Sequence, residues 1–157
     1  MKIRLRHQDG FTIPELLVVI GIVALLAGIS LFILRPDSKD IQRRNAERQL
    51  DIAMLAQVVG AYHKKTGKLP EGISTTPKTI GNTEGEVDLC KALVPDYLTD
   101  IPFDPLSGGA ETSEACNVDN QQYTSAYTIA VNKAGTIIVV AAPDAEDNQT
   151  ITVSKQL

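Results

Sequence analysis

The sequence has few of the residues that most enzyme and metal sites require. Its 157 residues include two histidines, two cysteines and no tryptophan, and aromatic residues make up only 4%. It contains no Cys-x-x-Cys pair, no glycine-rich phosphate loop and no cluster of metal ligands at a recognisable spacing. We therefore expect no catalytic residues, no metal site and no cofactor.

Positive charge is also limited. Lysine and arginine total 15 against 19 acidic residues, which gives a formal net charge of −4. This balance argues against nucleic-acid binding as the main role of the chain. A basic stretch does occur at Lys39, Arg43, Arg44 and Arg48, and we interpret it, together with Glu47 and Gln49, as a solvated helix face.

One long apolar run stands out against this background. Residues 16–34 are 19 consecutive residues without a charge, and as a helix they extend about 28 Å, close to the thickness of a bilayer core. The run is too long for a secretory signal peptide and lacks a small-x-small ending. Lys2, Arg4 and Arg6 precede it, which predicts a cytoplasmic N-terminus with everything after Arg35 outside.

The start of the run contains an unexpected carboxylate. The boundary reads Gly10-Phe11-Thr12-Ile13-Pro14-Glu15. A charge in an apolar segment costs about 3 kcal/mol, so Glu15 marks a function and needs a partner. Gly10 allows an extended backbone at this point, and Pro14 discourages helix across the Gly10-Phe11 bond.

This boundary resembles the class III signal of type IV prepilins and type II secretion pseudopilins. Their signal has a short basic leader ending in Gly, an aromatic first mature residue and Glu at the fifth mature position. The resemblance implies cleavage between Gly10 and Phe11 and N-methylation of Phe11. It also implies that Glu15 meets the Phe11 amine of a neighbouring subunit, although a place in the headgroup region is the alternative. Pro14 departs from the commonest pattern, a bulky aliphatic residue before the Glu.

The resemblance implies an α+β, pilin-like fold. A long N-terminal helix, membrane-spanning in its first half, would pack on a small C-terminal antiparallel sheet. The expected divisions are a leader peptide at 1–10, a transmembrane and assembly helix at 11–34, an amphipathic helix at 35–66 and an exported globular head at 67–157. The implied partners are prepilin peptidase, other copies of the chain, minor pilins and an inner-membrane assembly platform.

Periodicity supports this division. Apolar residues at the spacing of one helical stripe continue to Tyr62, and we expect a kink or break at Pro36. The stripe consists of Ile52, Leu55, Ala56, Val59 and Tyr62. Beyond it the sequence predicts a surface loop at 71–88, a short helix within 89–98, and strands at 123–131, 136–142 and 150–154, the first two joined by a hairpin turn at 132–135.

Both cysteines, Cys90 and Cys116, lie in the part predicted to be exported to an oxidising compartment. A disulfide between them is therefore predicted, and closing the loop of about 27 residues would contribute roughly 3.5 kcal/mol. Two free, buried thiols are the alternative.

The acidic groups that could in principle bind calcium are Asp104, Asp119, Asp144, Glu146 and Asp147. We interpret them as solvated loop residues. Some major pseudopilins carry calcium in a C-terminal loop, but that motif cannot be matched here residue by residue.

The leading hypothesis is a structural subunit of a type IV pilus or of a type II secretion-type filament. Such a subunit is a single-pass cytoplasmic membrane protein before assembly and part of an extracellular or periplasmic filament afterwards. The alternative is a signal-anchored membrane protein whose exported domain binds a ligand or partner without polymerising.

Overall fold

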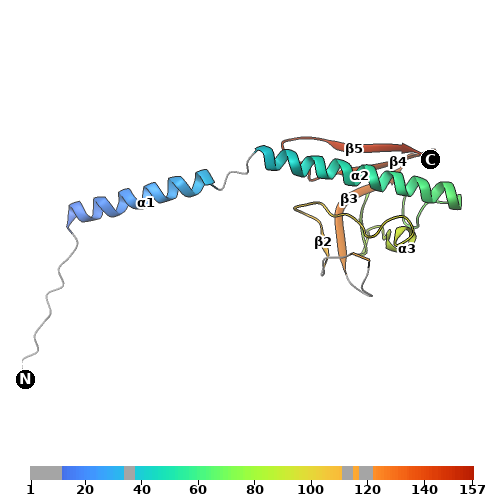
Figure 1. Cartoon of the computed structure of the whole chain (residues 1–157), viewed down its shortest axis with the longest axis horizontal. Helices are drawn as coiled ribbons and strands as arrows, with labels where there is room; N and C mark the ends of the chain where they lie inside the picture. The colour runs from blue at the N-terminus through green and yellow to red at the C-terminus, as the bar shows by residue number, and fades with distance from the viewer. Residues whose placement is uncertain (1–11, 34–37, 111–114, 117–121) are drawn as a thin grey trace, which may run out of the picture. The chain divides into compact units, whose positions relative to one another are not determined.

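The computed structural model describes residues 12–33, 38–110, 115–116 and 122–157, with the side chains of the first helix described up to residue 28. The fold is α+β, as expected, and the chain divides into two compact units after Asp37 (Figure 1). The elements in chain order are α1 (Ile13–Ile33), α2 (Ser38–Thr66), β1 (Lys78–Gly81), α3 (Cys90–Leu93), β2 (Gly109–Ala110), β3 (Tyr123–Val131), β4 (Ile137–Ala142) and β5 (Ile151–Gln156).

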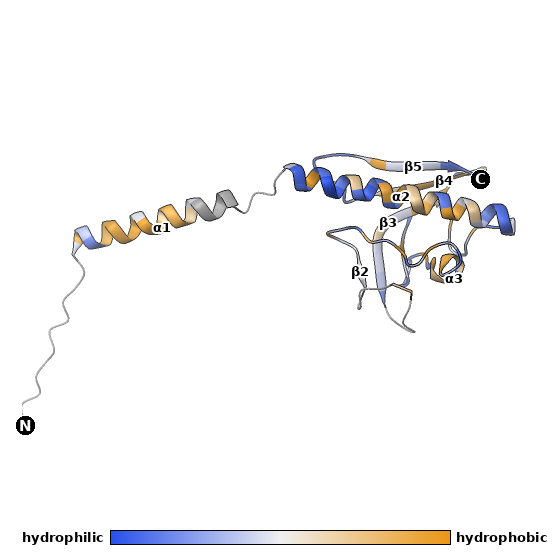
Figure 2. Ribbon diagram, in the orientation of Figure 1, coloured by the Kyte–Doolittle hydropathy of each residue, from blue (hydrophilic) through white to orange (hydrophobic). Residues whose placement is uncertain are grey.

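After Glu15 in its first turn, helix α1 is apolar on all sides along the part whose side chains are described (Figure 2). Its large apolar side chains from Leu16 to Leu26 are 47–65% exposed, so this part of the helix has no buried face within the chain. Within the described ranges, no helix is both long enough and apolar enough to cross a membrane. The predicted span of 16–34 therefore stays a prediction.

Helix α2 is amphipathic, and its buried face packs on β4 and β5. The predicted stripe is confirmed, since Ile52, Leu55 and Val59 are fully buried. The helix ends at Thr66, and Gly67 then adopts a left-handed conformation with φ of 71°. There the Gly67 N–H donates to the His63 carbonyl at 2.8 Å, which satisfies a carbonyl of the last turn.

The sheet is antiparallel, with strand order β1-β3-β4-β5 and β2 also paired to β3. The β3–β4 hairpin turn lies at 132–135, where the Asn132 N–H donates to the Ile137 carbonyl at 2.8 Å and Gly135 has φ of 71°. Strand β3 carries an irregularity at Ala126, which has a positive φ of 61° where the register with β1 shifts.

The core of the second unit lies between α2 and the sheet. Apolar side chains of α2 meet those of β3 and β4, and residues of the long segment between α2 and β3 close the remaining side. The central residues include Ile52, Leu55, Val59, Ile80, Leu89, Leu93, Tyr127, Ile129, Ile138 and Val140. Helix α2 and the segments after it form one compact unit, Ser38–Leu157, which we call the head from here on.

One expectation about the segment after α2 needs correction. The predicted loop at 71–88 contains strand β1, because Lys78 and Thr79 pair with β3, and the side chain of Ile80 in this strand is fully buried. The predicted short helix within 89–98 is confirmed as α3, which is a single turn. The expected break at Pro36 lies outside the described residues.

Candidate functional site: the start of the first helix

The first turn of α1 is closed by two reciprocal hydrogen bonds between Thr12 and Glu15. The Glu15 backbone N–H donates to Thr12 Oγ1 at 3.4 Å, and the Thr12 backbone N–H donates to Glu15 Oε2 at 3.5 Å. This arrangement is a capping box, which satisfies two of the donors that a helix leaves free at its N-terminus. It also holds the Glu15 carboxylate at the positive end of the helix dipole.

Pro14 fits the same turn. It is the second residue of α1, where a missing N–H removes no hydrogen bond within the helix. The first backbone bond runs from the Leu16 N–H to the Thr12 carbonyl at 3.1 Å. If the helix began one turn earlier, residue 14 would have to donate to the Gly10 carbonyl, which proline cannot do. Thr12 and Pro14 together therefore set the start of α1.

The predicted site residues are only partly described. Glu15 lies in the first turn of α1, and its side chain is exposed within the chain. Gly10 and Phe11, the predicted cleavage and methylation residues, lie outside the described residues. A role for Glu15 in assembly stays a prediction.

A second polar constellation lies inside the head, around Arg48. This side chain is fully buried, and its Nε and Nη2 donate to the two oxygens of Asp104 at 2.6 and 3.1 Å. Its Nη1 donates to Asn45 Oδ1 at 2.8 Å and to Glu146 Oε2 at 2.9 Å. Arg44 adds two bonds of 2.6 Å to Glu146. The network ties α2 to the loop before β2 and to the β4–β5 connection.

The charges in this network stabilise one another. Burial alone raises the pKa of Asp104, but hydrogen bonds from Arg48 and from the backbone of Leu106 and Ser107 outweigh that effect and lower the pKa. Hydrogen bonds from Arg44, then from Arg48, lower the pKa of Glu146 to about 2. Both carboxylates are therefore ionised at neutral pH, as a buried guanidinium requires.

These contacts correct two sequence interpretations. Arg48 was expected on a solvated face, yet it lies in phase with Ile52, Leu55 and Val59 and is buried with them. Asp104 and Glu146 were expected to be solvated, yet Asp104 is buried and both belong to this network. Extending the apolar stripe one helical turn backward would have placed Arg48 on the buried face.

The comparisons bear on the N-terminal site. Residues 5–31 match the family model of the prokaryotic N-terminal methylation motif. This match supports a type IV pilin-like precursor. No match was found among curated proteins or among solved structures. The motif spans the predicted cleavage bond, Glu15 and most of α1, and it supports processing of the precursor by prepilin peptidase.

The two cysteines of the precursor are joined. Cys90, the first residue of α3, forms a disulfide with Cys116. The Asp100 carboxylate fixes the backbone beside the bridge, because it accepts hydrogen bonds from the N–H groups of Ala115 and Cys116 at 2.8 and 3.1 Å. The predicted disulfide is therefore present in the head of the precursor.

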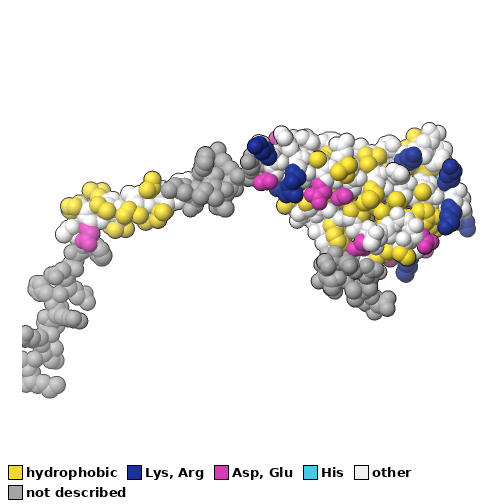
Figure 3. Space-filling view, in the orientation of Figure 1, with side chains coloured by type: hydrophobic (Ala, Val, Ile, Leu, Met, Phe, Trp, Pro, Cys, Tyr) yellow, Lys and Arg dark blue, Asp and Glu magenta, His cyan; other side chains and the backbone are white. Residues whose placement is uncertain are grey.

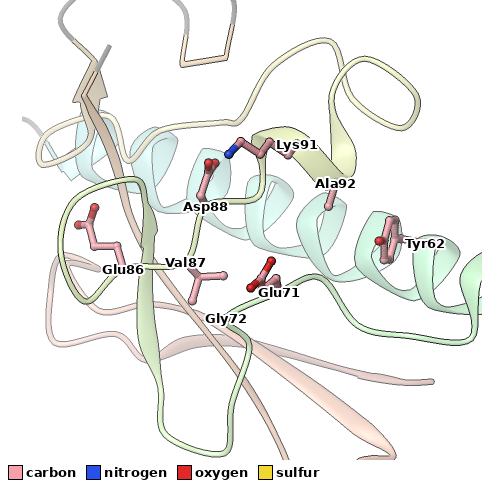
Figure 4. A pocket seen from close by; sticks show the side chains of 8 residues that line it. All are labelled: Tyr62, Glu71, Gly72, Glu86, Val87, Asp88, Lys91 and Ala92. Carbon is pink, nitrogen blue, oxygen red and sulfur yellow. The ribbon is translucent and has the colours of Figure 1, made fainter. Parts of the chain in front are cut away.

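The head of the precursor also has an open cleft of about 380 Å³ beside α3 (Figure 4). Tyr62 reaches it from α2, and Glu71 lies on the loop that follows that helix. Two of its carboxylates hold the local backbone. Glu86 accepts from the Thr83 N–H and the Thr124 hydroxyl, and Asp88 accepts from the Cys90 N–H and the Tyr123 hydroxyl. Their contacts are those of structural residues.

Among the residues that the structure describes, no group of three or more His, Cys, Asp or Glu side chains is placed to hold a metal ion. His63 lies at the end of α2, half-buried, beside Lys64 in a second open cleft. The capping box was the feature that sequence reasoning missed at the N-terminus. Its signal was present, because a Thr three residues before a Glu, ahead of an apolar run, is the pattern of a capped helix start.

Proposed function

We propose that this chain is a structural subunit of a filament of the type IV pilus or type II secretion class. Prepilin peptidase cleaves the precursor after Gly10, and the new N-terminal Phe11 is then N-methylated. The subunit polymerises through residues 11–34 and carries its head outside the membrane. The observation that carries the proposal is the methylation motif at 5–31, continued by a helix whose described large apolar side chains are all exposed.

The physical argument rests on what α1 leaves unsatisfied. Ten exposed large apolar side chains lie between Ile13 and Leu26, far more than a helix in water would retain. A bilayer covers them in the precursor, and neighbouring subunits cover them in the filament. Before assembly, the capping box supplies the Glu15 carboxylate with a backbone donor. In the filament, the Phe11 amine of a neighbouring copy is its proposed cationic partner.

The remaining partners follow from the same proposal. They are minor pilins, which share the filament, and an assembly platform in the inner membrane that extracts the processed subunit. The precursor is then a single-pass cytoplasmic membrane protein with its N-terminus inside.

The test is the mass and N-terminal sequence of the protein recovered from its native cells, in membrane and in sheared extracellular fractions. A mature chain that begins at Phe11 with one added methyl group, present in sheared material, is the expected result. A full-length chain confined to the membrane would overturn the proposal and favour a signal-anchored binding domain.

A further inference from the structure

A cleft of about 690 Å³ lies between the last turns of α2 and the end of β5. Clefts of roughly 300–1,000 Å³ are the usual size for small-molecule sites, in which apolar lining is combined with a few polar groups. Gly60, Ala61 and Leu157 contribute apolar surface here, and none of the side chains that line the cleft is acidic. The cleft therefore has the size and lining of a ligand site, with only basic and neutral polar side chains.

The polar side chains of this cleft are not engaged by the head itself. Within the residues that the structure describes, none of them forms a hydrogen bond or an ion pair. They are Gln57, His63, Lys64, Lys155 and Gln156. The first cleft, beside α3, differs in this respect, because its Glu86 and Asp88 carboxylates hold the local backbone. The polar groups of the second cleft are thus available to a ligand.

Lys155 is positioned before any ligand binds. In β5, Ile151 and Val153 pack against the core, and the alternation of the strand turns Lys155 to the same side. Its side chain lies over Gly60 of α2, where an added Cβ would be 3.5 Å from Lys155 Cγ and 3.6 Å from its Cε. An inward lysine also protects an edge strand such as β5 from pairing with another sheet. That protection needs only Lys155, whereas here Lys64 lines the same cleft, one helical turn after Gly60.

Positive charge gathers around this cleft. The last turn of α2 contains Lys64 and Lys65, and in Figure 3 several dark blue side chains lie at that end of the head. Lys65 has a different contact, since its Nζ lies 5.6 Å from the centre of the Tyr97 ring. The carboxylate of Leu157, the last residue of the sequence, is in no ion pair with a described residue. Lys64 and Lys155 are thus left without a paired counter-charge in the described part of the chain.

We propose that this cleft binds a small anion that carries an apolar portion. A carboxylate or phosphate lies between Lys64 and Lys155 and receives a further hydrogen bond from His63, and the apolar portion lies against Gly60 and Ala61. Charge-assisted hydrogen bonds from the two lysines hold the anionic group. Because Lys155 is already packed against α2, little of its freedom is lost on binding. The inference does not rest on the proposed function, because every lining residue belongs to the head.

The first experiment titrates the full chain, in micelles of a zwitterionic detergent, with hexanoate, hexyl phosphate, inorganic phosphate and hexanol. Equilibrium dialysis against empty micelles measures binding, and amide NMR locates it. We expect hexanoate or hexyl phosphate to saturate one site, with the largest amide shifts at Gly60, Ala61 and Lys155, and the tighter of the two identifies the anionic group. Inorganic phosphate and hexanol should each bind at least about tenfold more weakly, since each lacks one half of the ligand. Equal binding of hexanol or of inorganic phosphate overturns the proposal.

Charge reversal tests the residues of the cleft. Lys155→Glu should weaken binding by about tenfold or more, because it removes a charge-assisted hydrogen bond and adds repulsion. Lys91→Glu is the matched control, since it makes the same change in net charge at an exposed lysine of the first cleft, and it should bind like the wild type. Far-UV circular dichroism and the disulfide on a non-reducing gel verify that both variants fold. Equal affinities in the two variants overturn the site, and uptake that does not saturate shows partition into detergent and overturns it as well.

Discussion

Helices α1 and α2 differ in what fixes their positions and in how much of their apolar surface is buried. Helix α1 leaves its described large apolar side chains exposed and is fixed locally, by the Thr12–Glu15 capping box at its start. Helix α2 buries one face on the sheet and fixes its position with Arg48, a charged residue inside the core. The first helix is therefore specified by short-range sequence, and its described large apolar side chains stay exposed within the chain. The second is specified by contacts with residues far away in the chain.

Because the two helices are specified independently, changes in the head should not affect the processing of the N-terminus.

The largest effect on stability is expected for Arg48→Ala, which leaves Asp104 buried without its cation and should lower the free energy of unfolding by about 3–5 kcal/mol. Urea unfolding of the full chain in detergent, followed by tyrosine fluorescence, measures it. Arg43→Ala, an exposed change on the same helix, should stay within about 0.5 kcal/mol. A loss below about 1 kcal/mol for Arg48→Ala would contradict the structural role of the network.

The next largest effect is expected for the disulfide. Replacing Cys90 and Cys116 together by serine should lower the free energy of unfolding of the head by about 3.5 kcal/mol, because the bridge closes a chain segment with a sequence separation of 26. The same urea titration measures it. Cleavage by prepilin peptidase in membranes should proceed at the wild-type rate. Slower cleavage would show that the two regions are coupled.

A smaller effect is expected at the start of α1. Thr12→Val removes the hydroxyl acceptor and should destabilise the first turn by about 1 kcal/mol. Amide hydrogen exchange of Glu15 in micelles should then be about fivefold faster, while the head amides are unchanged. Thr12→Ser keeps the hydroxyl and serves as the control. Equal exchange rates in the valine variant and the wild type would rule out a stabilising capping box.

The smallest effect is a dependence on pH at the partly exposed end of the network. Because the pKa of Glu146 is lowered from 4.5 to about 2 on folding, its stabilisation is complete above pH 4.5 and is lost as the pH falls toward 2. The lowered pKa of Asp104 acts in the same direction, whereas burial raises the pKa of Asp51 and opposes it.

Glu146→Gln should therefore show a smaller drop in urea midpoint between pH 5 and about 2 than the wild type does. The difference should shrink with added salt, because the Arg44–Glu146 pair is partly exposed. An Asp51→Asn variant should show a steeper drop, since it removes the opposing contribution. Identical acid profiles for Glu146→Gln and the wild type would contradict the assigned pKa.

Much of the fold could be predicted because its signals are local. The period of the apolar stripe predicted the buried face of α2, and the β-branched and aromatic runs predicted β3, β4 and β5. Strand β1 could not be predicted, because its four residues become a strand only by pairing with β3, across more than forty residues of chain. Likewise, nothing in the local sequence shows that Asp104 is buried opposite an arginine.

The sequence by itself determined the N-terminal site. Thr12, Pro14 and Glu15 act within one helical turn, and the methylation motif of residues 5–31 is contiguous, so no distant contact is needed to form either. Only the tertiary structure decided which charges are buried. Arg48 can be buried because folding brings Asp104 and Glu146, 56 and 98 residues away in the chain, within hydrogen-bond distance of its guanidinium. The same packing leaves Leu50 outside, since it lies on the exposed side of α2.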